Sequence, residues 1–267
     1  MTASLLTSNG HIRDSIVTLE DVGVRYRVPR GGVRSIKEYL LLAMRGQLRF
    51  DDFWALENID LTISAGERLG VIGRNGAGKS TLLQVIASVL RPTTGRVAVL
   101  GRVAPLLQLG AGFDPELSGR ENVYLNGALL GMKRATIRAR FDAIVEFAEL
   151  DEFIDAPLRT YSTGMAGRLG FAVATECQPD VLLLDEVLAV GDEAFQSKCV
   201  ERLREFTGRG TTLVLVTHDA DLVMRECTRV VWIRDKRIVA DGEPSDVVDA
   251  YHRFLSKNDM ATLLPSH

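Results

Sequence analysis

The sequence GRNGAGKST, at residues 73–81, decides the fold of this 267-residue chain. It matches the phosphate-binding pattern G-x-x-x-x-G-K-[ST] at each fixed position. Residues 67–72, just before it, form a short apolar run that predicts a strand, and residues 81–86 have the apolar character of a buried helix. Strand, loop and helix in this order are the context that the pattern requires. The stretch therefore predicts a nucleotide-binding α/β protein.

The chemistry of this phosphate loop follows from its residue types. Glycines let the backbone wrap around an anion with its N–H groups pointing inward, and the helix N-terminus adds the positive end of its dipole. Lys79 supplies a point charge for the outer phosphates, and the Ser80 hydroxyl can hold Mg²⁺. A glycine-rich loop without a ligand would need neither the lysine nor the hydroxyl. The loop residues that we assign to nucleotide contact are Gly73, Asn75, Gly76, Ala77, Gly78, Lys79, Ser80 and Thr81.

Composition sets outer limits on fold and partners. The length allows one large domain, or a domain with a smaller lobe. A net charge of −3 and a pI near 5.9 give no reason to expect a nucleic-acid partner. There is no run of 18 apolar residues that would predict a membrane span. Three widely spaced cysteines without a C-x-x-C pattern indicate free thiols in a reducing compartment.

Hydrophobic patterning predicts the arrangement of the remaining elements. Alternating residues predict strands at 15–22 and 59–63, whereas the continuous apolar runs at 180–184 and 212–216 are typical of parallel strands buried on both faces. Residues 230–233 and 237–240 favour a hairpin, and the region between 115 and 161 has helical periodicity. We expect an α/β P-loop core with a mostly parallel sheet, an N-terminal antiparallel β part and an inserted α-helical subdomain.

Domain boundaries follow from the same patterns. We expect a polar tail at 1–14, a nucleotide-binding domain at 15–255 and a C-terminal tail at 256–267. Two segments stand apart within the domain: an insertion at 30–52 and a helical subdomain at about 115–165. In the insertion, residues 36–48 carry apolar side chains every fourth position with arginines outside that stripe, which predicts a basic amphipathic helix. Such a helix packs on its own domain or lies against a membrane or a membrane partner.

A second constellation stands at the end of an apolar run, where Asp185 and Glu186 follow four apolar residues. A carboxylate at the tip of a buried strand orients Mg²⁺, which is the role we assign to Asp185. Glu186 is the candidate general base for water that attacks the γ-phosphate. Taken alone, the run is equally typical of a strand that ends in solvated acids. Together with the phosphate loop it predicts ATP hydrolysis.

At residues 161–165 the sequence YSTGM resembles the signature Leu-Ser-Gly-Gly-Gln of the ATP-binding-cassette ATPases. Ser162 and Gly164 match that signature, while the two residues beside Gly164 do not. The resemblance implies that this segment begins a helix and presents Ser162 and Gly164 to the γ-phosphate of a nucleotide held by a second subunit. An ordinary helix cap also favours Ser and Gly, but the place of the segment between the two nucleotide motifs favours the functional interpretation.

The same resemblance assigns further residues. Gln108 resembles the glutamine that contacts Mg²⁺ and water and couples to the membrane subunit, although a surface polar residue is the alternative. Asp192 ends a stretch that resembles the loop touching the opposite subunit, and His218 resembles the histidine that hydrogen-bonds the γ-phosphate. A structural histidine at a strand end is the alternative for His218. For the adenine ring the best match is Tyr26, with Trp54 as the second candidate.

Within the family, the chain resembles the ATPases of polysaccharide exporters. The resemblance rests on the insertion before Trp54, on the strings LLQLGAGF and GRENVYLNG that begin at residues 106 and 119, and on the YSTGM signature. It implies a homodimer that binds ATP and Mg²⁺, joins a separately encoded transmembrane permease at the cytoplasmic face of the bacterial inner membrane, and serves the export of a lipid-linked glycan. O-antigen, teichoic acid and galactan are the candidate glycans.

Two further expectations complete this interpretation. Galactan is a candidate glycan because 26 of the 32 basic residues are arginine, which is typical of GC-rich genomes. We also expect no appended carbohydrate-binding domain, because the chain ends at residue 267. The alternative functions are a soluble ATPase of the same superfamily acting in translation or DNA repair, and the ATPase of a nutrient importer. The absence of a second cassette or a long coiled-coil insertion disfavours the soluble ATPase, and the insertion together with the region of Gln108 disfavours the importer.

Overall fold

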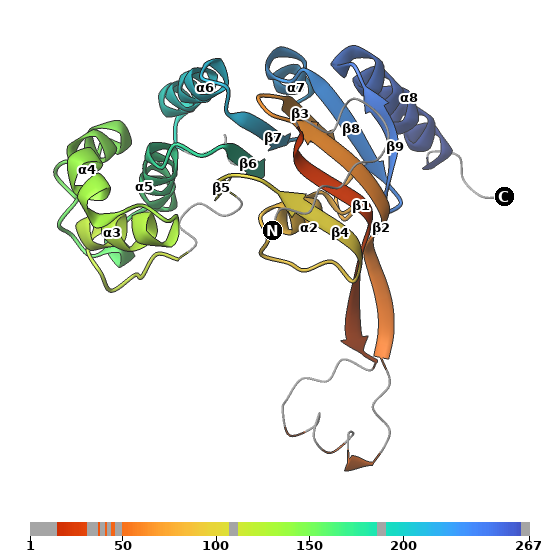
Figure 1. Cartoon of the computed structure of the whole chain (residues 1–267), viewed down its shortest axis with the longest axis horizontal. Coiled ribbons are helices and arrows are strands. Elements are labelled where there is room, and N and C mark those ends of the chain that lie inside the picture. Colours follow the sequence, from red (N-terminus) through yellow and green to blue (C-terminus); the bar gives the residue numbers. More distant parts are fainter. Residues whose placement is uncertain are drawn as a thin grey trace, which may run out of the picture.

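The computed structural model describes residues 15–30, 37, 41, 44, 45, 50–106, 112–185 and 191–262. Two sheets organise these residues (Figure 1). The smaller sheet is antiparallel with the order β2-β1-β4, and its strands are β1 (Ser15–Pro29), β2 (Phe50–Ser64) and β4 (Thr94–Val99). The far ends of β1 and β2 project away from the rest of the chain as a two-stranded arm.

The larger sheet has six strands in the order β5-β6-β7-β3-β8-β9. All neighbours pair in parallel except the last two, β8 and β9, which form an antiparallel hairpin. The strands are β3 (Arg68–Ile72), β5 (Val103–Leu106), β6 (Val181–Asp185), β7 (Thr212–Val216), β8 (Arg229–Arg234) and β9 (Arg237–Gly242). Every residue of β7 is buried, as expected for a central strand covered on both faces.

The core lies on both sides of this sheet. One face packs against the antiparallel sheet with α2 (Lys79–Ile86) between them, and Leu82 and Leu83 of α2 are fully buried there. The other face is covered by helices that carry apolar residues at helical spacing. These are α5 (Thr163–Glu176), α6 (Glu193–Gly208), α7 (Ala220–Glu226) and α8 (Pro244–Thr262). The expected fold class, an α/β core with an antiparallel β part, is confirmed.

A helical lobe stands beside the sheets (Figure 1). It consists of α3 (Gly119–Leu129), α4 (Arg134–Ala148), a 3-10 turn at Leu158–Thr160 and the face of α5 that carries Leu169, Ala172 and Val173. A capping box begins α3, because the Ser118 side chain accepts from the backbone N–H of Glu121 while the Glu121 carboxylate accepts from Ser118. Helix α5 belongs to both the lobe and the core, and therefore joins the two.

Several boundaries differ from the sequence-based expectation. β2 begins at Phe50, so residues 50–52, which we placed in the insertion, belong to a strand, and α8 continues to Thr262 across the boundary that we placed at 255/256. The extension of β2 pairs with β1, and α8 packs against β8 through Phe254, which lies on Trp232 just before the extension. Strands β4 and β5 were not predicted.

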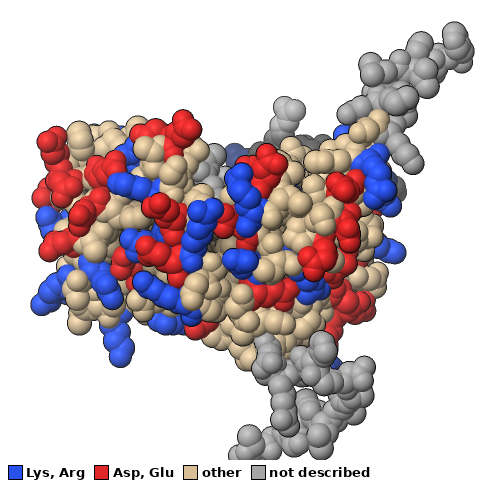
Figure 2. All heavy atoms as spheres, turned by 90° about the horizontal axis from the view of Figure 1, so that it is seen from above, with Lys and Arg blue, Asp and Glu red and all other residues tan. Residues whose placement is uncertain are grey.

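The amphipathic helix expected at 36–48 lies mostly outside the described residues. Within it, Leu41 and Met44 are in helical conformation, and Met44 is 79% exposed. Of the helices in the described part of the chain, none combines the length and the apolar character that crossing a bilayer requires. Figure 2 shows basic and acidic side chains interspersed across the visible face.

Candidate nucleotide-binding site

The carboxyl ends of three adjacent parallel strands define the site. The phosphate loop, residues 73–81, follows β3, Asp185 ends β6, and His218 lies two residues beyond β7. The register aligns these ends, because Val216 of β7 pairs with both Asp185 and Val71. Ligands of open α/β sheets bind outside this edge. Residues far apart in the sequence are thereby brought to one place.

Packing explains two glycines of the phosphate loop. Gly73 has φ +151, and a Cβ there would overlap the carbonyl oxygen of Ile233 in β8. Gly78 has φ +115, and a Cβ there would come within 2.5 Å of the carbonyl oxygen of Ala55 in β2. The loop is therefore wedged between β8 and β2. Its central glycine, Gly76, also has positive φ, but open space surrounds its missing Cβ.

Two hydrogen-bond donors, the Lys79 ammonium and the Ala77 N–H, bond to backbone carbonyl groups of this loop. The Lys79 ammonium donates to the carbonyl oxygens of Gly73 at 2.8 Å and Arg74 at 3.2 Å, and this side chain is 6% exposed. The Ala77 N–H donates to the Arg74 carbonyl at 3.1 Å. Helix α2 begins directly after Gly78 and has no side-chain cap, and the positive end of its dipole faces the loop. This arrangement is suited to holding an anion at the start of a helix.

These elements border an open cleft of about 490 Å³, which we call the nucleotide cleft. It brings together the phosphate loop, the end of β6 and the arm formed by β1 and β2. The lining residues are Tyr26, Phe53, Ala55, Asn75, Gly76, Gly78, Lys79, Ser80, Thr81 and Asp185. Gly73 and Ala77 shape the loop without lining the cleft.

Strand pairing separates the two aromatic candidates. In the register of β1 and β2, Tyr26 pairs with Phe53, and Arg25 pairs with Trp54. Neighbouring residues of a strand point to opposite faces, so Tyr26 and Phe53 share the cleft face and Trp54 lies on the other. There the Arg25 guanidinium lies 5.4 Å from the centre of the Trp54 ring. Sequence analysis missed Phe53, whose face is fixed only by the register.

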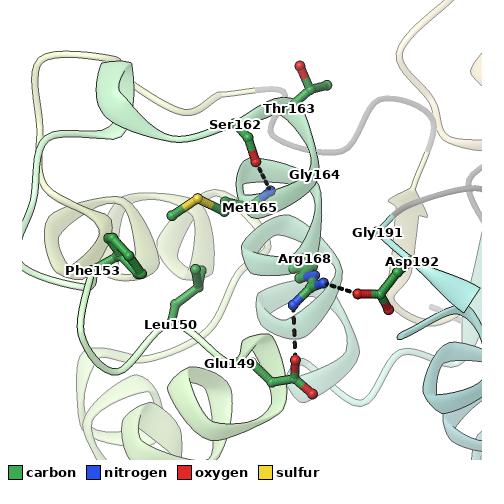
Figure 3. A pocket seen from close by; sticks show the side chains of 10 residues that line it. All are labelled: Glu149, Leu150, Phe153, Ser162, Thr163, Gly164, Met165, Arg168, Gly191 and Asp192. Atoms are coloured by element: carbon green, nitrogen blue, oxygen red, sulfur yellow. Dashed lines mark hydrogen bonds and ion pairs between the residues drawn. The ribbon is translucent and has the colours of Figure 1, made fainter. Parts of the chain in front are cut away.

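A second pocket, of about 560 Å³, lies at the start of α5 (Figure 3). We call it the signature pocket. Ser162 caps α5, because its hydroxyl oxygen accepts from the Met165 N–H at 3.1 Å. A Cβ on Gly164 would meet Gly191 only at 4.0 Å, so the signature segment adjoins the loop before α6. The lining residues are Glu149, Leu150, Phe153, Ser162, Thr163, Gly164, Met165, Arg168, Gly191 and Asp192.

Arg168 links the end of α4 to the start of α6 in this pocket (Figure 3). Its guanidinium donates to Glu149 at 2.9 Å and to Asp192 at 2.8 Å, and it lies 5.0 Å from the centre of the Phe195 ring. The second carboxylate oxygen of Asp192 accepts from the Phe195 N–H at 2.9 Å and caps α6. That backbone bond, together with Arg168, lowers the pKa of Asp192. Both Asp192 oxygens thus have partners within the chain.

The structure does not bring all the predicted residues into one pocket. The nucleotide cleft and the signature pocket share no lining residue. His218 is exposed and lines neither pocket. Gln108 and Glu186 lie outside the described residues, so their roles remain predictions.

The nucleotide cleft also suits a magnesium ion. The Ser80 hydroxyl and the Asp185 carboxylate both line it, beside the lysine of the phosphate loop. Mg²⁺ prefers oxygen ligands and is usually held by one or two protein groups together with phosphates and water. No cluster of three or more histidine, cysteine or acidic side chains that could hold a metal ion occurs among the described residues.

A phosphate loop at a helix start, facing the carboxylate that ends a neighbouring parallel strand, defines the P-loop class of nucleotide-binding proteins. Comparison with solved structures finds the same fold in a nucleotide-binding cassette. The dimeric cassette MJ0796, solved with ADP and phosphate, superposes with a TM-score of 0.69 at 23% identity, covering 85% of this chain and 98% of the other. At this identity the likeness concerns the fold.

Sequence comparisons narrow the class. The family described as ABC transporter matches residues 56–189. The O-antigen export system ATP-binding protein RfbB is 48% identical in Klebsiella pneumoniae, over 76% of this chain and 83% of that protein. RfbB of Myxococcus xanthus is also 48% identical, over 91% of this chain but 56% of that protein. The teichoic acids export ATP-binding protein TagH of Lactiplantibacillus plantarum is 38% identical, over 89% of this chain and 64% of that protein. The chain belongs to the ABC transporter family, as one of its ATP-binding proteins.

Proposed function

We propose that this chain is the ATP-hydrolysing subunit of an ABC transporter that exports a lipid-linked polysaccharide across the bacterial inner membrane. Identity of 48% over 91% of the chain to a protein named for O-antigen export carries the assignment of the transported class. The similarity to TagH widens that class from O-antigen to cell-envelope glycans more generally. O-antigen, teichoic acid and galactan stay open as cargo.

The separation of the two pockets supports a site composed of two chains. A nucleotide in the nucleotide cleft of one chain would be closed by Ser162 and Gly164 of a second chain. The start of α5 would then direct its dipole at the γ-phosphate. Two chains related by a two-fold axis would form two such sites, because a contact of this kind is reciprocal. Closure and reopening of the pair would supply the mechanical output.

Hydrolysis at this composite site is assigned as follows. Lys79 neutralises the outer phosphates, and the Ser80 hydroxyl and Asp185 would hold Mg²⁺, which offsets charge on the phosphates. Glu186 accepts the proton of the attacking water, and His218 hydrogen-bonds the γ-phosphate once the second chain has closed the site. Gln108 and the helical lobe would pass the movement to a separately encoded permease, which places the chain at the cytoplasmic face of the membrane.

The composite site is tested by mixing two inactive variants. Lys79→Met disables the phosphate loop while keeping the buried aliphatic stem. Gly164→Asp places a negative charge beside the γ-phosphate site, and a Cβ fits at this position because its nearest neighbours are 3.7 and 4.0 Å away. A mixed dimer contains one doubly disabled site and one intact site.

The expected result is ATP hydrolysis by the mixture, in the presence of the permease, when each variant alone has none. Two copies of a single variant, mixed in the same way, serve as the control. Continued inactivity of the mixture, with mixed dimers shown by mass spectrometry, would contradict a site shared between chains.

The role of Glu186 has its own test. Glu186→Gln removes the proton acceptor without changing the size of the side chain. Turnover should fall by about a hundredfold or more, and ATP with Mg²⁺ should trap a dimer that elutes earlier in size-exclusion chromatography. Near-normal hydrolysis would remove Glu186 from the role of base.

Export is tested with the membrane partner. The chain should co-purify with a multi-spanning membrane protein, and ATP turnover of that complex in liposomes should rise when a lipid-linked glycan from the same cell envelope is added. The matched control is the same lipid carrier without the glycan. Association with ribosomes or DNA, or stimulation by a nutrient-binding protein, would contradict an exporter.

A further inference from the structure

Lys236 occupies a strained place in the chain. The hairpin of β8 and β9 turns through two residues, Asp235 and Lys236, between the paired residues Arg234 and Arg237. Both turn residues have positive φ, +50 for Asp235 and +70 for Lys236. A two-residue turn of this kind prefers glycine at its second position, because other side chains are strained there. Residues with strained backbone conformations are found more often at functional sites than elsewhere.

The Lys236 side chain reaches the phosphate loop. Its ammonium donates to the carbonyl oxygen of Gly76 at 2.8 Å and lies 4.7 Å from the centre of the Phe53 ring. The backbone carbonyl of Lys236 accepts from the Glu57 N–H at 2.9 Å, which ties the turn to β2. The ammonium is thus held between the aromatic ring and the loop by a cation–π contact and a charge-assisted hydrogen bond.

The bond to the Gly76 carbonyl bears on how the loop binds anions. That carbonyl and the Ala77 N–H belong to one peptide unit, and a trans peptide directs them to opposite sides. The Ala77 N–H points across the loop, to the Arg74 carbonyl at 3.1 Å. The Lys236 ammonium holds the Gly76 carbonyl at one side of this peptide, and the Arg74 carbonyl holds the Ala77 N–H at the other, so the two bonds together fix the orientation of the peptide and the shape of the loop. Open space surrounds the missing Cβ of Gly76, so this peptide has no side-chain packing on its Gly76 side, whereas the Ala77 side chain is buried.

We propose that Lys236 is a positioning residue of the nucleotide site: it holds the Gly76–Ala77 peptide, and with it the turn that shapes the phosphate loop, and the Phe53 ring holds the ammonium in place. The inference rests on nucleotide binding by the phosphate loop and is independent of what the transporter exports. This role distinguishes Lys236 from a residue that only completes the turn between β8 and β9.

The test measures the thermal stability and the ligand affinity of the same variants, because the proposal predicts a loss of affinity without a loss of stability. Lys236→Gly relieves the positive φ, so the Tm of the full chain should stay the same or rise. Its affinities for ATP and for tripolyphosphate, each with Mg²⁺, should both fall about five- to thirtyfold, as expected for one charge-assisted bond. Lys236→Met keeps the length of the side chain without its charge and should bind as weakly as Lys236→Gly.

Asp235→Gly is the matched control, because it relieves the neighbouring positive φ in a side chain that is 88% exposed and pairs only with Arg234 among the described residues. It should bind both ligands like the wild type. Wild-type affinity in Lys236→Gly or Lys236→Met overturns the proposal. So does a loss confined to ATP, which would place the effect at the base. A wild-type chain that binds neither ligand would instead overturn the nucleotide site itself.

Discussion

Gly73→Ala and Gly76→Ala form a pair of substitutions whose effects the structure separates. Both glycines belong to the phosphate loop and both have positive φ, +151 and +74. A Cβ on Gly73 would overlap the Ile233 carbonyl oxygen, whereas a Cβ on Gly76 would have no neighbour within 4 Å. The two substitutions therefore add the same methyl group to a packed and to an open part of one loop.

The expected magnitudes follow from these surroundings. At Gly73, backbone strain of about 1–3 kcal/mol adds to about 1–3 kcal/mol for displacing a buried strand. A sum near 4 kcal/mol lowers the Tm by about 8–16 °C in a domain of this size. At Gly76, a left-handed alanine costs about 1–2 kcal/mol, and the reduced entropy of the unfolded chain offsets about 0.4–1 kcal/mol of it. That Tm should fall by no more than about 4–6 °C.

Thermal unfolding with and without ATP and Mg²⁺ provides the assay. Saturating ligand at a hundred times its Kd stabilises the wild type by about 2.7 kcal/mol, which is a Tm increase of about 5–10 °C. Gly73→Ala should lose this increase together with its stability, because the loop is displaced from β8. If Gly73→Ala unfolds at the wild-type temperature and keeps the full response to ATP, the wedged loop described above is wrong.

Three further predictions address other parts of the chain. Tyr26→Ala should weaken ATP binding about tenfold and leave tripolyphosphate binding unchanged, because only the base stacks on the ring. Trp54→Ala, the control, should lower stability without this difference between the two ligands. If Tyr26→Ala weakens the binding of both ligands equally, the adenine does not stack on Tyr26. Asn122→Ala should cost about 3 kcal/mol in urea unfolding, because this fully buried amide makes four hydrogen bonds to backbone groups of the helical lobe, and a cost below about 1 kcal/mol would refute that account. Burial raises the pKa of Cys199 and Cys227 to about 12, so at pH 8 both thiols stay protonated and should resist alkylation until urea unfolds the chain; rapid labelling of the folded protein would show that they are not buried.

The local motifs were accessible from the sequence because each depends on a short stretch of chain. The phosphate loop needs glycines at fixed spacing, a lysine and a hydroxyl, and all of these are visible in nine residues. The strands β6 and β7 could be predicted because burial on both faces requires a continuous apolar run. The fold class followed from the order of such elements along the chain.

The contacts between distant segments could not be predicted in this way. Phe53 lines the nucleotide cleft because the register of β1 and β2 pairs it with Tyr26, and a shift of one residue would have placed Trp54 there instead. The contact of Asp192 with a second chain stays a prediction; within the chain, both its oxygens accept hydrogen bonds, from Arg168 and from the start of α6. The Tyr26–Phe53 pairing and the Asp192–Arg168 bond depend on contacts between distant segments, whereas the cap that Asp192 forms on α6 is local.

The sequence by itself determined that the chain binds phosphate, where the loop lies and that β6 and β7 are buried, because these features depend on local residue types. Only the tertiary structure decided what surrounds the loop. Lys236 lies 160 residues from Gly76, and they meet because β8 is the neighbour of β3 in the sheet. Strand order and register are global properties of the packed core, so the composition of the site beyond its motif appears only when the chain is folded.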